Sequence, residues 1–357
     1  MSQYKVVLVG LGKRGGHHLA AFKKDPRFQI AGIVDIDQAR LDKTAAELGG
    51  KVVAGTDAAA VARDVKPDIF CFCTLPNLRL PMVKIGVEAG AKLIAYEKPI
   101  AMSQNEALEI RELVLKAGVK TVVSHQHRYG VHYQKVKELI DSGAIGKVHT
   151  VYGTAVGWMT HIITHLIDYS RWYAGNPEAE WVIGSASGKG KYADNHPSPD
   201  YVTGLIQFKN GVRGIIECGA GAPDVPEVDY WWRKNRIGAQ GTDGFVEVLT
   251  GGGWRAVTKK GAMSGDGCMN YDLDTAPYVK DMADWLDDEG KVHPCNGESA
   301  HAGHEIWMGI LRSVVERGQV KLPLGPGESE VEALRKALPD KPVLVSFDGN
   351  RKEYLGA

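Results

Sequence analysis

Apolar residues along the first third of the chain follow two alternating patterns. Short runs rich in β-branched residues, typical of buried strands, alternate with stretches whose apolar residues recur every three or four positions, typical of helices. The runs that we expect to form strands span residues 5–9, 29–34, 52–54, 68–74, 92–96 and 121–123. Strands alternating with helices predict a doubly wound parallel sheet, here an α/β Rossmann domain over residues 1–124.

Beyond residue 125 the pattern changes to longer β-rich segments separated by Gly, Asn and Asp turns. Asn210-Gly211, between two apolar runs, is a strong hairpin signal. We therefore expect residues 125–357 to form an α+β domain with a large, mostly antiparallel open sheet, which binds the substrate and carries the oligomer contacts. We expect a late helix over residues 299–317, which can pack on the Rossmann domain. We also expect a final strand over residues 343–347.

The first expected strand leads directly into a glycine-rich turn, Gly10-Leu11-Gly12-Lys13-Arg14-Gly15, and then into a helix. Gly10 permits the tight turn, Gly12 lets a pyrophosphate approach the backbone, and Gly15 lets the helix pack close to the strand. The N–H groups and the dipole at the helix start favour phosphate. The next strand ends in Asp35, at the distance where a carboxylate accepts hydrogen bonds from the adenosine ribose. This combination predicts NAD as the cofactor; in the alternative, the glycines form only a structural turn and Asp35 caps a helix.

Two carboxylates favour NAD over NADP. Asp35 and Asp37 would repel a 2′-phosphate, although Lys13 and Arg14 in the glycine turn would offset part of that repulsion.

Length and composition agree with a two-domain protein. The 357 residues exceed one ordinary core, and 43 basic residues balance 43 acidic ones, so the chain has no general attraction for nucleic acid or anionic membranes. No apolar run approaches the roughly 20 residues of a membrane span, and the N-terminus lacks a secretory pattern. Five scattered cysteines fit reduced thiols better than a disulfide framework, so we expect a cytoplasmic protein.

A second cluster, Tyr96-Glu97-Lys98-Pro99, lies at the carboxyl end of an expected parallel strand, where open α/β sheets bind ligands. Taken alone, it could be a solvated turn. Together with the glycine turn, it makes the chain resemble the glucose-fructose oxidoreductase, inositol dehydrogenase and rhizopine-catabolism family, usually called Gfo/Idh/MocA. Further positions that carry this resemblance are His18, Thr74, Pro76, Asn77, Arg128, residues 143–146 and residues 165–168.

The resemblance implies a two-domain enzyme that moves a hydride between a sugar or polyol carbon and the nicotinamide. Lys98 would then lie beside the reacting hydroxyl, and His165 would be the acid/base. Elementary chemistry agrees, because a secondary alcohol needs a base active near pH 7 and an ammonium favours the developing alkoxide. Besides the glycine turn and Asp35, the cofactor contacts implied are Thr74, Pro76, Asn77, Glu97 and Lys98.

The segment around His165 departs from the family pattern. On a helix His161, His165 and Asp168 share one face, and the family commonly has aspartate where this chain has His161. Three interpretations compete: His161 is a second acid/base or substrate contact, a structural histidine, or part of a metal site with His125 or His127. No nearby Cys or Glu completes a metal-binding set, so we predict no metal.

Aromatic and polar residues of the second domain suggest a carbohydrate pocket, because aromatic faces pack against sugar C–H groups. The substrate contacts that we expect are Arg128, Tyr129, Trp158 and Asp168, with Asp194, His196, Tyr230, Trp231, Trp232 and Arg233 in or near expected loops. The alternative is that the tryptophans fill the core or a subunit interface. Because an exposed sheet face usually needs a partner, we expect a homodimer or homotetramer.

These residues support an NAD-dependent sugar or polyol dehydrogenase. An alternative is a glycoside-cleaving enzyme in which NAD oxidises a hydroxyl transiently, elimination follows and the hydride returns, with His161 as the additional acid/base. A third class, a catalytically silent sensor, is disfavoured because Lys98 and His165 are both present.

Overall fold

The computed structural model describes residues 3–189 and 195–339. The chain divides into two compact units, each discontinuous in sequence. Unit 1 comprises residues 1–101, 106–129 and 270–301, and unit 2 comprises residues 102–105, 130–269 and 302–357. Two positions named above, Asp194 and the expected strand over 343–347, lie outside the described residues.

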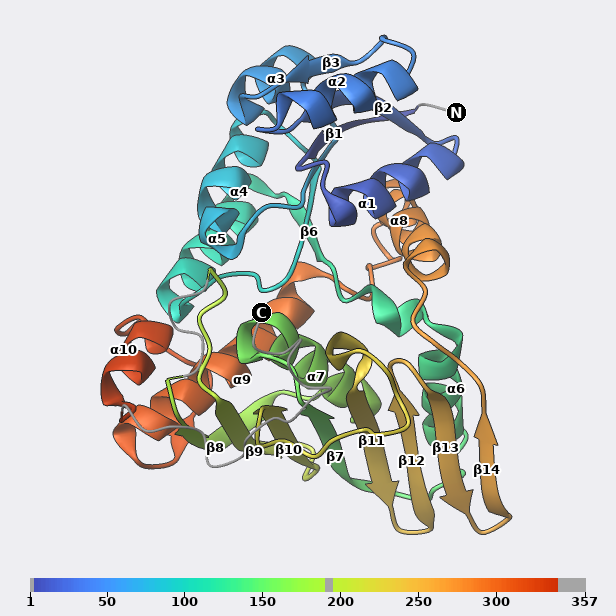
Figure 1. Cartoon of the computed structure of the whole chain (residues 1–357), viewed down its shortest axis with the longest axis vertical. Helices are drawn as coiled ribbons and strands as arrows, with labels where there is room; N and C mark the ends of the chain where they lie inside the picture. The colour runs from blue at the N-terminus through green and yellow to red at the C-terminus, as the bar shows by residue number, and fades with distance from the viewer. Residues whose placement is uncertain (1–2, 190–194, 340–357) are drawn as a thin grey trace. The chain divides into compact units, whose positions relative to one another are not determined.

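Unit 1 contains a six-stranded sheet in which every strand pairing is parallel (Figure 1). The strand order is β3-β2-β1-β4-β5-β6, so the chain reverses its direction of winding after β3. The strands are β1 (Tyr4–Val9), β2 (Phe28–Val34), β3 (Val53–Gly55), β4 (Ile69–Phe72), β5 (Leu93–Tyr96) and β6 (Lys120–Val123). The order and direction confirm the doubly wound Rossmann sheet that the sequence predicts.

Helices cover both faces of this sheet because each strand is apolar on both sides. Val7 and Val9 pack with α3–α5 on one face, whereas Val6 and Leu8 pack with α1, α2 and α8 on the other. The helices are α1 (Lys13–Lys24), α2 (Gln38–Glu47), α3 (Ala58–Val65), α4 (Arg79–Glu88), α5 (Gln104–Ala117) and α8 (Tyr271–Asp287), with short 3₁₀ turns η1 (Pro76–Leu78) and η2 (Gln126–Tyr129).

Helix α8 was not predicted, and it comes from the far end of the sequence. It lies beside α1, and its buried residues Tyr278, Val279 and Met282 complete the core on that face of the sheet (Figure 1). The periodicity of one segment cannot show which distant sheet it will cover, so the return of residues 270–301 to unit 1 had no local signal.

Unit 2 is built on a nine-stranded sheet with the order β14-β13-β12-β11-β7-β10-β9-β8-β15. All neighbours pair antiparallel except β7 and β10, which are parallel, so the mostly antiparallel open sheet is confirmed. The strands are β7 (Val148–Ala155), β8 (Ala179–Ser187), β9 (Tyr201–Phe208), β10 (Arg213–Gly219), β11 (Asn235–Gly241), β12 (Gly244–Leu249), β13 (Gly253–Thr258), β14 (Gly261–Gly265) and β15 (Val320–Lys321). The hairpin at Asn210-Gly211 joins β9 to β10, as predicted.

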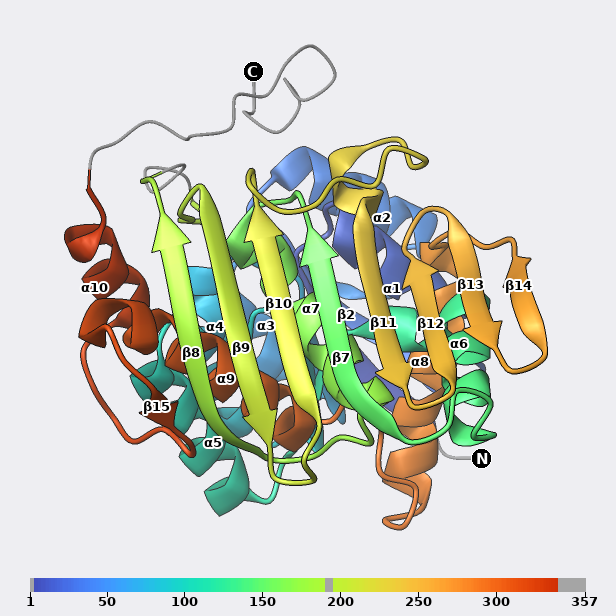
Figure 2. The same cartoon turned by 90° about the horizontal axis from the view of Figure 1, so that it is seen from below.

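The helices among the described residues of unit 2 pack against one face of this sheet (Figure 2). Helix α7 is buried almost all around, although seven of its 15 residues are polar, His165 and Asp168 among them. The helices are α6 (Val131–Asp141), α7 (Met159–Tyr173), α9 (Gly297–Glu316) and α10 (Glu330–Ala337), with a 3₁₀ turn η3 (Trp231–Arg233). Within the described ranges, no helix is both long enough and apolar enough to cross a membrane.

Two facing glycines let α9 approach the sheet closely. Gly184 of β8 pairs with Gly204 of β9, and the fully buried Ile310 of α9 fills the gap that they leave. A Cβ atom at Gly184 would lie 2.4 Å from the Ile310 carbonyl oxygen. We therefore expect Gly184→Ala to destabilise the protein by about 1–3 kcal/mol, because backbone must shift to relieve the overlap.

The measurement is the melting temperature by differential scanning calorimetry, which should fall by a few degrees. Ser185→Ala, at the adjacent exposed position, is the matched control and should leave the melting temperature nearly unchanged. Equal melting temperatures for the wild type and Gly184→Ala would contradict this account of the packing.

Candidate functional site

The glycine turn between β1 and α1 is held by backbone packing at two of its three glycines. Gly10 has a φ of +83°, and a Cβ there would lie 2.6 Å from the Cys73 carbonyl oxygen. A Cβ at Gly15 would lie 1.8 Å from the Gly10 carbonyl oxygen. At Gly12, in contrast, a Cβ would meet no atom of the described residues within 4 Å. Packing of the turn therefore requires glycine at positions 10 and 15, whereas Gly12 has open space where a side chain would lie.

That open space fits a dinucleotide. Gly12 is the N-cap of α1 and has no side chain to accept from the first-turn N–H groups, and the first turn carries no acidic residue. Such a helix start attracts phosphate through its N–H groups and its dipole. Gly10, Leu11, Gly12, Lys13, Arg14 and Gly15 are therefore arranged as a pyrophosphate site requires.

Asp35, which follows β2, is almost fully buried, with 4% of its surface exposed. Its carboxylate accepts hydrogen bonds from the N–H groups of Leu11 (2.6 Å) and Asp37 (2.9 Å), and both of its oxygens lie 3.2 Å from Arg40 Nη1. Burial opposes ionisation, but the two N–H groups and then Arg40 outweigh it and lower the Asp35 pKa. The sequence pattern identified Asp35 as a ribose acceptor but missed Arg40, which covers it.

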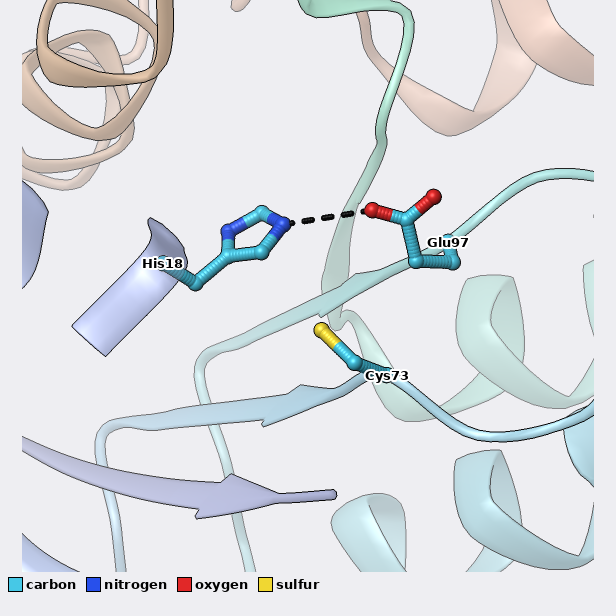
Figure 3. A group of neighbouring side chains, drawn as sticks. All are labelled: His18, Cys73 and Glu97. Atoms are coloured by element: carbon cyan, nitrogen blue, oxygen red, sulfur yellow. Dashed lines mark hydrogen bonds and ion pairs between the residues drawn. The ribbon is translucent and has the colours of Figure 1, made fainter. Parts of the chain in front are cut away.

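Three side chains meet at the carboxyl ends of neighbouring strands, and we name them the His18 group: His18 of α1, Cys73 after β4 and Glu97 after β5 (Figure 3). His18 Nε2 lies 3.3 Å from Glu97 Oε1 and 3.4 Å from the Ser124 hydroxyl, which in turn contacts the Tyr278 hydroxyl at 3.3 Å. The parallel sheet brings the group together, because its strands end at one edge.

The charges of the His18 group follow from burial and pairing. Burial alone would raise the Glu97 pKa, but the hydrogen bond from His18 and the nearby charges of Arg14, His18 and Lys98 lower it to about 2. Cys73 is half-buried, and Cys71 together with the partial burial raises the pKa of its thiol, so the thiol is neutral near pH 7. We therefore attribute the raised pKa of His18, which burial opposes, mainly to Glu97, so the two form an imidazolium–carboxylate pair.

The ligand atoms of the His18 group lie within 4.8 Å of one another, close enough to hold a metal ion. A metal would require neutral His18 and ionised Cys73, and it would lie near the positive charges of Arg14 and Lys98. Because these charges and protonation states disfavour the binding of a cation, we do not assign a metal to the His18 group. The sequence pattern includes His18 only within the family resemblance, and it gives no signal that Cys73 lies beside His18 and Glu97.

Lys98 is half-buried next to Glu97 in the chain. Burial lowers its pKa to about 8, with Arg14 and Arg79 acting in the same direction and Glu97 opposing them. Arg79, 1% exposed, donates to the carbonyl oxygens of Thr74 (2.9 Å), Pro99 (2.8 Å) and Lys98 (3.2 Å). Arg79 therefore ties the chain after β4 to the chain after β5, a role that the sequence pattern did not reveal.

The remaining cofactor candidates lie in the same unit. Thr74 is half-buried after β4, Pro76 begins η1 and is buried, and Asn77 in that turn is exposed. The Arg14 guanidinium stacks 3.8 Å from the Tyr271 ring centroid and donates to the Tyr271 hydroxyl. Arg14 is thus oriented by α8, which sequence reasoning had not connected to this edge.

Two expected substrate residues, Arg128 and Tyr129, lie in η2 of unit 1. Arg128 is 3% exposed, and its Nη1 donates to the Pro294 carbonyl oxygen at 3.3 Å. The Tyr129 hydroxyl donates to Asp281 at 2.7 Å, and its ring packs against Tyr278. These contacts give Tyr129 a role in packing α8 within the unit.

The other candidates gather on and beside α7 in unit 2. His165 is 9% exposed, and its Nδ1 lies 3.1 Å from the Tyr169 hydroxyl. His161, one turn earlier, is half-buried and stacks on His196 with ring centroids 3.9 Å apart. Asp168, on the same helix face, is 2% exposed.

Trp158, the N-cap of α7, is 7% exposed and packs with Val156 and Trp231. The Trp231 ring also meets the edge of His161, with centroids 5.9 Å apart. The structure therefore brings together His161, His165, Asp168 and Trp158 in one unit, and the glycine turn, Asp35, Glu97 and Lys98 in the other.

Two family models match this chain. The model described as the oxidoreductase family with an NAD-binding Rossmann fold matches residues 4–125, and the GFO/IDH/MocA C-terminal domain matches residues 152–247, together more than half of the chain. Among curated proteins, D-glucoside 3-dehydrogenase of Escherichia coli is 23% identical over 246 residues, 60% of this chain and 69% of the relative. Myo-inositol 2-dehydrogenase of Thermotoga maritima is 24% identical over 267 residues, 69% of this chain and 78% of the relative.

Solved structures share the fold over most of the chain. Levoglucosan dehydrogenase in complex with NADH and levoglucosan has a TM-score of 0.77 and 18% identity, covering 90% of this chain and all of the other. An oxidoreductase from Agrobacterium radiobacter in complex with NAD⁺, L-tartaric acid and magnesium also has a TM-score of 0.77 and 18% identity, covering 90% and 98%.

The His18–Glu97 pair predicts a pH-dependent stability. His18 has a higher pKa in the folded than in the unfolded protein, where it is 6.5. Its full contribution to the free energy of unfolding is therefore present below pH 6.5, and it is lost as the pH rises through the pKa of the folded protein. The pKa of Glu97 is lower in the folded than in the unfolded protein, where it is 4.5. Its contribution to the free energy of unfolding is therefore fully present above pH 4.5, and it is lost as the pH falls toward 2. The pair therefore stabilises most between about pH 4.5 and 6.5.

We expect His18→Gln to lower the melting temperature, and to lower it more at pH 6 than at pH 9.5, measured by differential scanning fluorimetry. His17→Gln is the matched control, because its exposed partner Asp272 makes a weak pair, and it should change little at either pH. A difference between wild type and His18→Gln that is constant or grows with pH would show that His18 is neutral.

Proposed function

This chain belongs to the GFO/IDH/MocA family of NAD-binding oxidoreductases, and from that premise we propose that it transfers a hydride between a secondary hydroxyl of a sugar, sugar derivative or polyol and the nicotinamide of NAD. The observation that carries the proposal is Lys98, a half-buried amine with a pKa lowered to about 8 at the strand edge that carries the glycine turn. Relatives named as glucoside and inositol dehydrogenases support the substrate class.

Acid–base chemistry is the part of the reaction that the protein must supply, because bound NAD provides the hydride acceptor. A secondary alcohol is too weak an acid to lose its proton unaided, so oxidation needs a base. We assign that base to His165, whose ring is oriented by the hydrogen bond between Nδ1 and the Tyr169 hydroxyl. Lys98 would stabilise the developing alkoxide by its charge and by donating a hydrogen bond.

Two residues support Lys98 in this role. Glu97, ionised and held by His18, offsets the cost of burying a positive charge beside it. Arg79 donates to the Lys98 carbonyl oxygen and so restrains the backbone. Cofactor contacts are assigned to the glycine turn, Asp35, Thr74, Pro76 and Asn77, and substrate contacts to Arg128, Trp158 and Asp168.

His161 supports a second candidate function. It lies one turn before His165 on the same face of α7 and is half-buried, so it can serve as an additional acid/base. In that alternative the enzyme would cleave glycosides. Bound NAD would supply transient oxidation of a hydroxyl, which makes an adjacent C–H acidic. A base would take that proton, the aglycone would leave with a proton, water would add to the resulting double bond, and the hydride would return to the carbonyl carbon.

A substrate panel tests the reaction class. The purified protein is incubated with NAD and with sugars, polyols and aryl glycosides, while NADH absorbance and aglycone release are followed together. We expect stoichiometric NADH from at least one alcohol. Glycoside cleavage without net NADH would instead select the alternative and reject the dehydrogenase.

Lys98→Ala and His165→Ala test the catalytic assignments. Each is expected to lower kcat by about 10²–10⁴-fold, because each removes a group that acts on the proton or the alkoxide. Dissociation constants for NADH, measured by fluorescence titration, test whether the loss lies in cofactor binding. Lys92→Ala, an exposed lysine at the other end of β5, is the matched control for Lys98. Near wild-type kcat in either test variant would contradict its assignment.

We further propose a homodimer or homotetramer formed through the helix-free face of the nine-stranded sheet (Figure 2). Ile183, Leu205 and Ile215 lie side by side on β8, β9 and β10 and are about two-fifths exposed. Adjacent exposed apolar residues on a bare sheet face favour a symmetric partner. The five cysteines, all within the described residues, form no disulfide bond, which supports a reducing compartment such as the cytoplasm.

Leu205→Arg is expected to shift the protein to a monomer, because a charge would be buried in the apolar contact. Light scattering coupled to size-exclusion chromatography measures the mass directly. Leu115→Arg, at an exposed leucine of α5, is the control and should keep the wild-type mass. A wild-type monomer, or a Leu205→Arg variant of unchanged mass, would contradict the proposed interface.

A further inference from the structure

The ring of His165 is tied to a tyrosine of its own helix. His165 Nδ1 lies 3.1 Å from the hydroxyl of Tyr169, one turn later on α7, and the two rings stack with centroids 5.6 Å apart. Tyr169 is 1% exposed and His165 is 9% exposed, so water has little access to this hydrogen bond. Such a hydrogen bond fixes the direction of an imidazole ring, and it also bears on which ring nitrogen carries the proton.

Tyr169 is itself held by neighbouring elements of unit 2. Its ring makes an edge-to-face contact with Tyr133 of α6, with centroids 5.0 Å apart. The Tyr133 hydroxyl lies 2.6 Å from Oγ1 of Thr250, which follows β12, and Asn235 at the start of β11 donates to the same oxygen at 3.2 Å. Tyr133, Thr250 and Asn235 are at most 5% exposed. Because a helix and two strand ends pack here, the Tyr169 hydroxyl stays at the His165 ring.

The chain places an oxygen atom at Nδ1 of His165. His161 lies one turn before His165 and stacks on His196, with centroids 3.9 Å apart. Tyr169 lies one turn after His165 and brings its hydroxyl to Nδ1. A hydroxyl oxygen can accept from an imidazole N–H, and its hydrogen can be donated to an imidazole lone pair, so two tautomers of His165 fit the distance.

Only one of these tautomers leaves His165 able to act as a base. If Tyr169 donates, Nδ1 is the acceptor and Nε2 carries the proton, so a neutral ring has no lone pair left for the substrate. If Tyr169 accepts from Nδ1–H, the Nε2 lone pair is free to take the proton of a secondary hydroxyl. The hydrogen bond then also persists in the imidazolium, because Nδ1 keeps its proton throughout.

We propose that Tyr169 is a positioning residue, which accepts a hydrogen bond from His165 Nδ1 and thereby holds the imidazole in the tautomer whose Nε2 is the base. This inference rests on the proposed function, which assigns the acid/base role to His165. The substrate proton forms the new Nε2–H bond, and the alcohol oxygen keeps the electron pair of the broken O–H bond. That pair forms the carbonyl as the C–H hydrogen leaves as a hydride to NAD. No proton moves to Tyr169, which acts through His165.

Nuclear magnetic resonance tests the tautomer without turnover, so its result does not depend on the proposed oxidation. Long-range ¹H–¹⁵N correlation spectra of protein labelled with ¹⁵N-histidine distinguish a protonated ring nitrogen from an unprotonated one, and His165→Gln identifies the His165 signals. We expect the neutral His165 ring to carry its proton on Nδ1. Tyr169→Phe should lower the ratio of the Nδ1–H to the Nε2–H tautomer by about twofold to tenfold, because it removes one hydrogen bond. A wild-type ring protonated on Nε2, or a ratio unchanged in Tyr169→Phe, would overturn the proposal.

Matched tyrosine variants separate positioning from packing. Tyr173, one turn further along α7, is equally buried, and its hydroxyl donates to the Tyr133 carbonyl oxygen at 3.1 Å. Tyr169→Phe should lower kcat about tenfold and leave KM nearly unchanged, because the base is less often in the competent tautomer and orientation. Tyr173→Phe should leave kcat, KM and the His165 tautomer unchanged.

An equal loss of kcat in both variants, or no loss in Tyr169→Phe, would contradict the positioning role. If the wild-type protein oxidises no alcohol, the proposed function fails, whereas the tautomer measurement still decides the role of Tyr169.

Discussion

A buried carboxylate must be paired with a positive charge, and Glu97 is such a carboxylate at the carboxyl edge of the first sheet. His18 pairs with it directly at 3.3 Å, and the charges of Arg14 and Lys98 act on it as well. Two of these cations contact a further element: Arg14 contacts Tyr271 of α8, and His18 contacts Ser124 after β6. One ionised side chain thus holds the glycine turn, two strand ends and a helix from the far end of the sequence in a single arrangement.

The same arrangement sets the pKa of Lys98. An amine surrounded by Arg14 and Arg79 in a partly buried position holds its proton less tightly than a solvated lysine, and Glu97 prevents that proton from being lost altogether. The resulting pKa of about 8 keeps the ammonium available near neutral pH while leaving it able to give up a proton. Burial and pairing therefore set the reactivity that the proposed function requires.

Burial and pairing also oppose each other at Asp35, where pairing prevails and lowers the pKa of the carboxylate. There the carboxylate is satisfied by two N–H groups and by Arg40, so the carboxylate that would repel a 2′-phosphate is covered by a cation. In unit 2, α7 is buried nearly all around, and the Tyr169 hydroxyl orients the ring of His165, which lies one turn earlier on the same helix. A rigid, enclosed helix is well suited to hold an acid/base in a fixed orientation.

The sequence alone determined the Rossmann sheet, the glycine turn and the antiparallel second sheet, because periodicity, turn residues and strand ends are local properties. It also named Glu97, Lys98 and His165 as candidate site residues, because motifs at strand ends and on helices are read from short segments. Only the tertiary structure decided what surrounds them. Three features depend on contacts between distant residues: Arg40 covers Asp35, Arg79 joins two strand ends, and Tyr271 and Tyr278 of α8 contact Arg14 and His18 of α1. Charge and pKa follow from those contacts, and no local pattern encodes them.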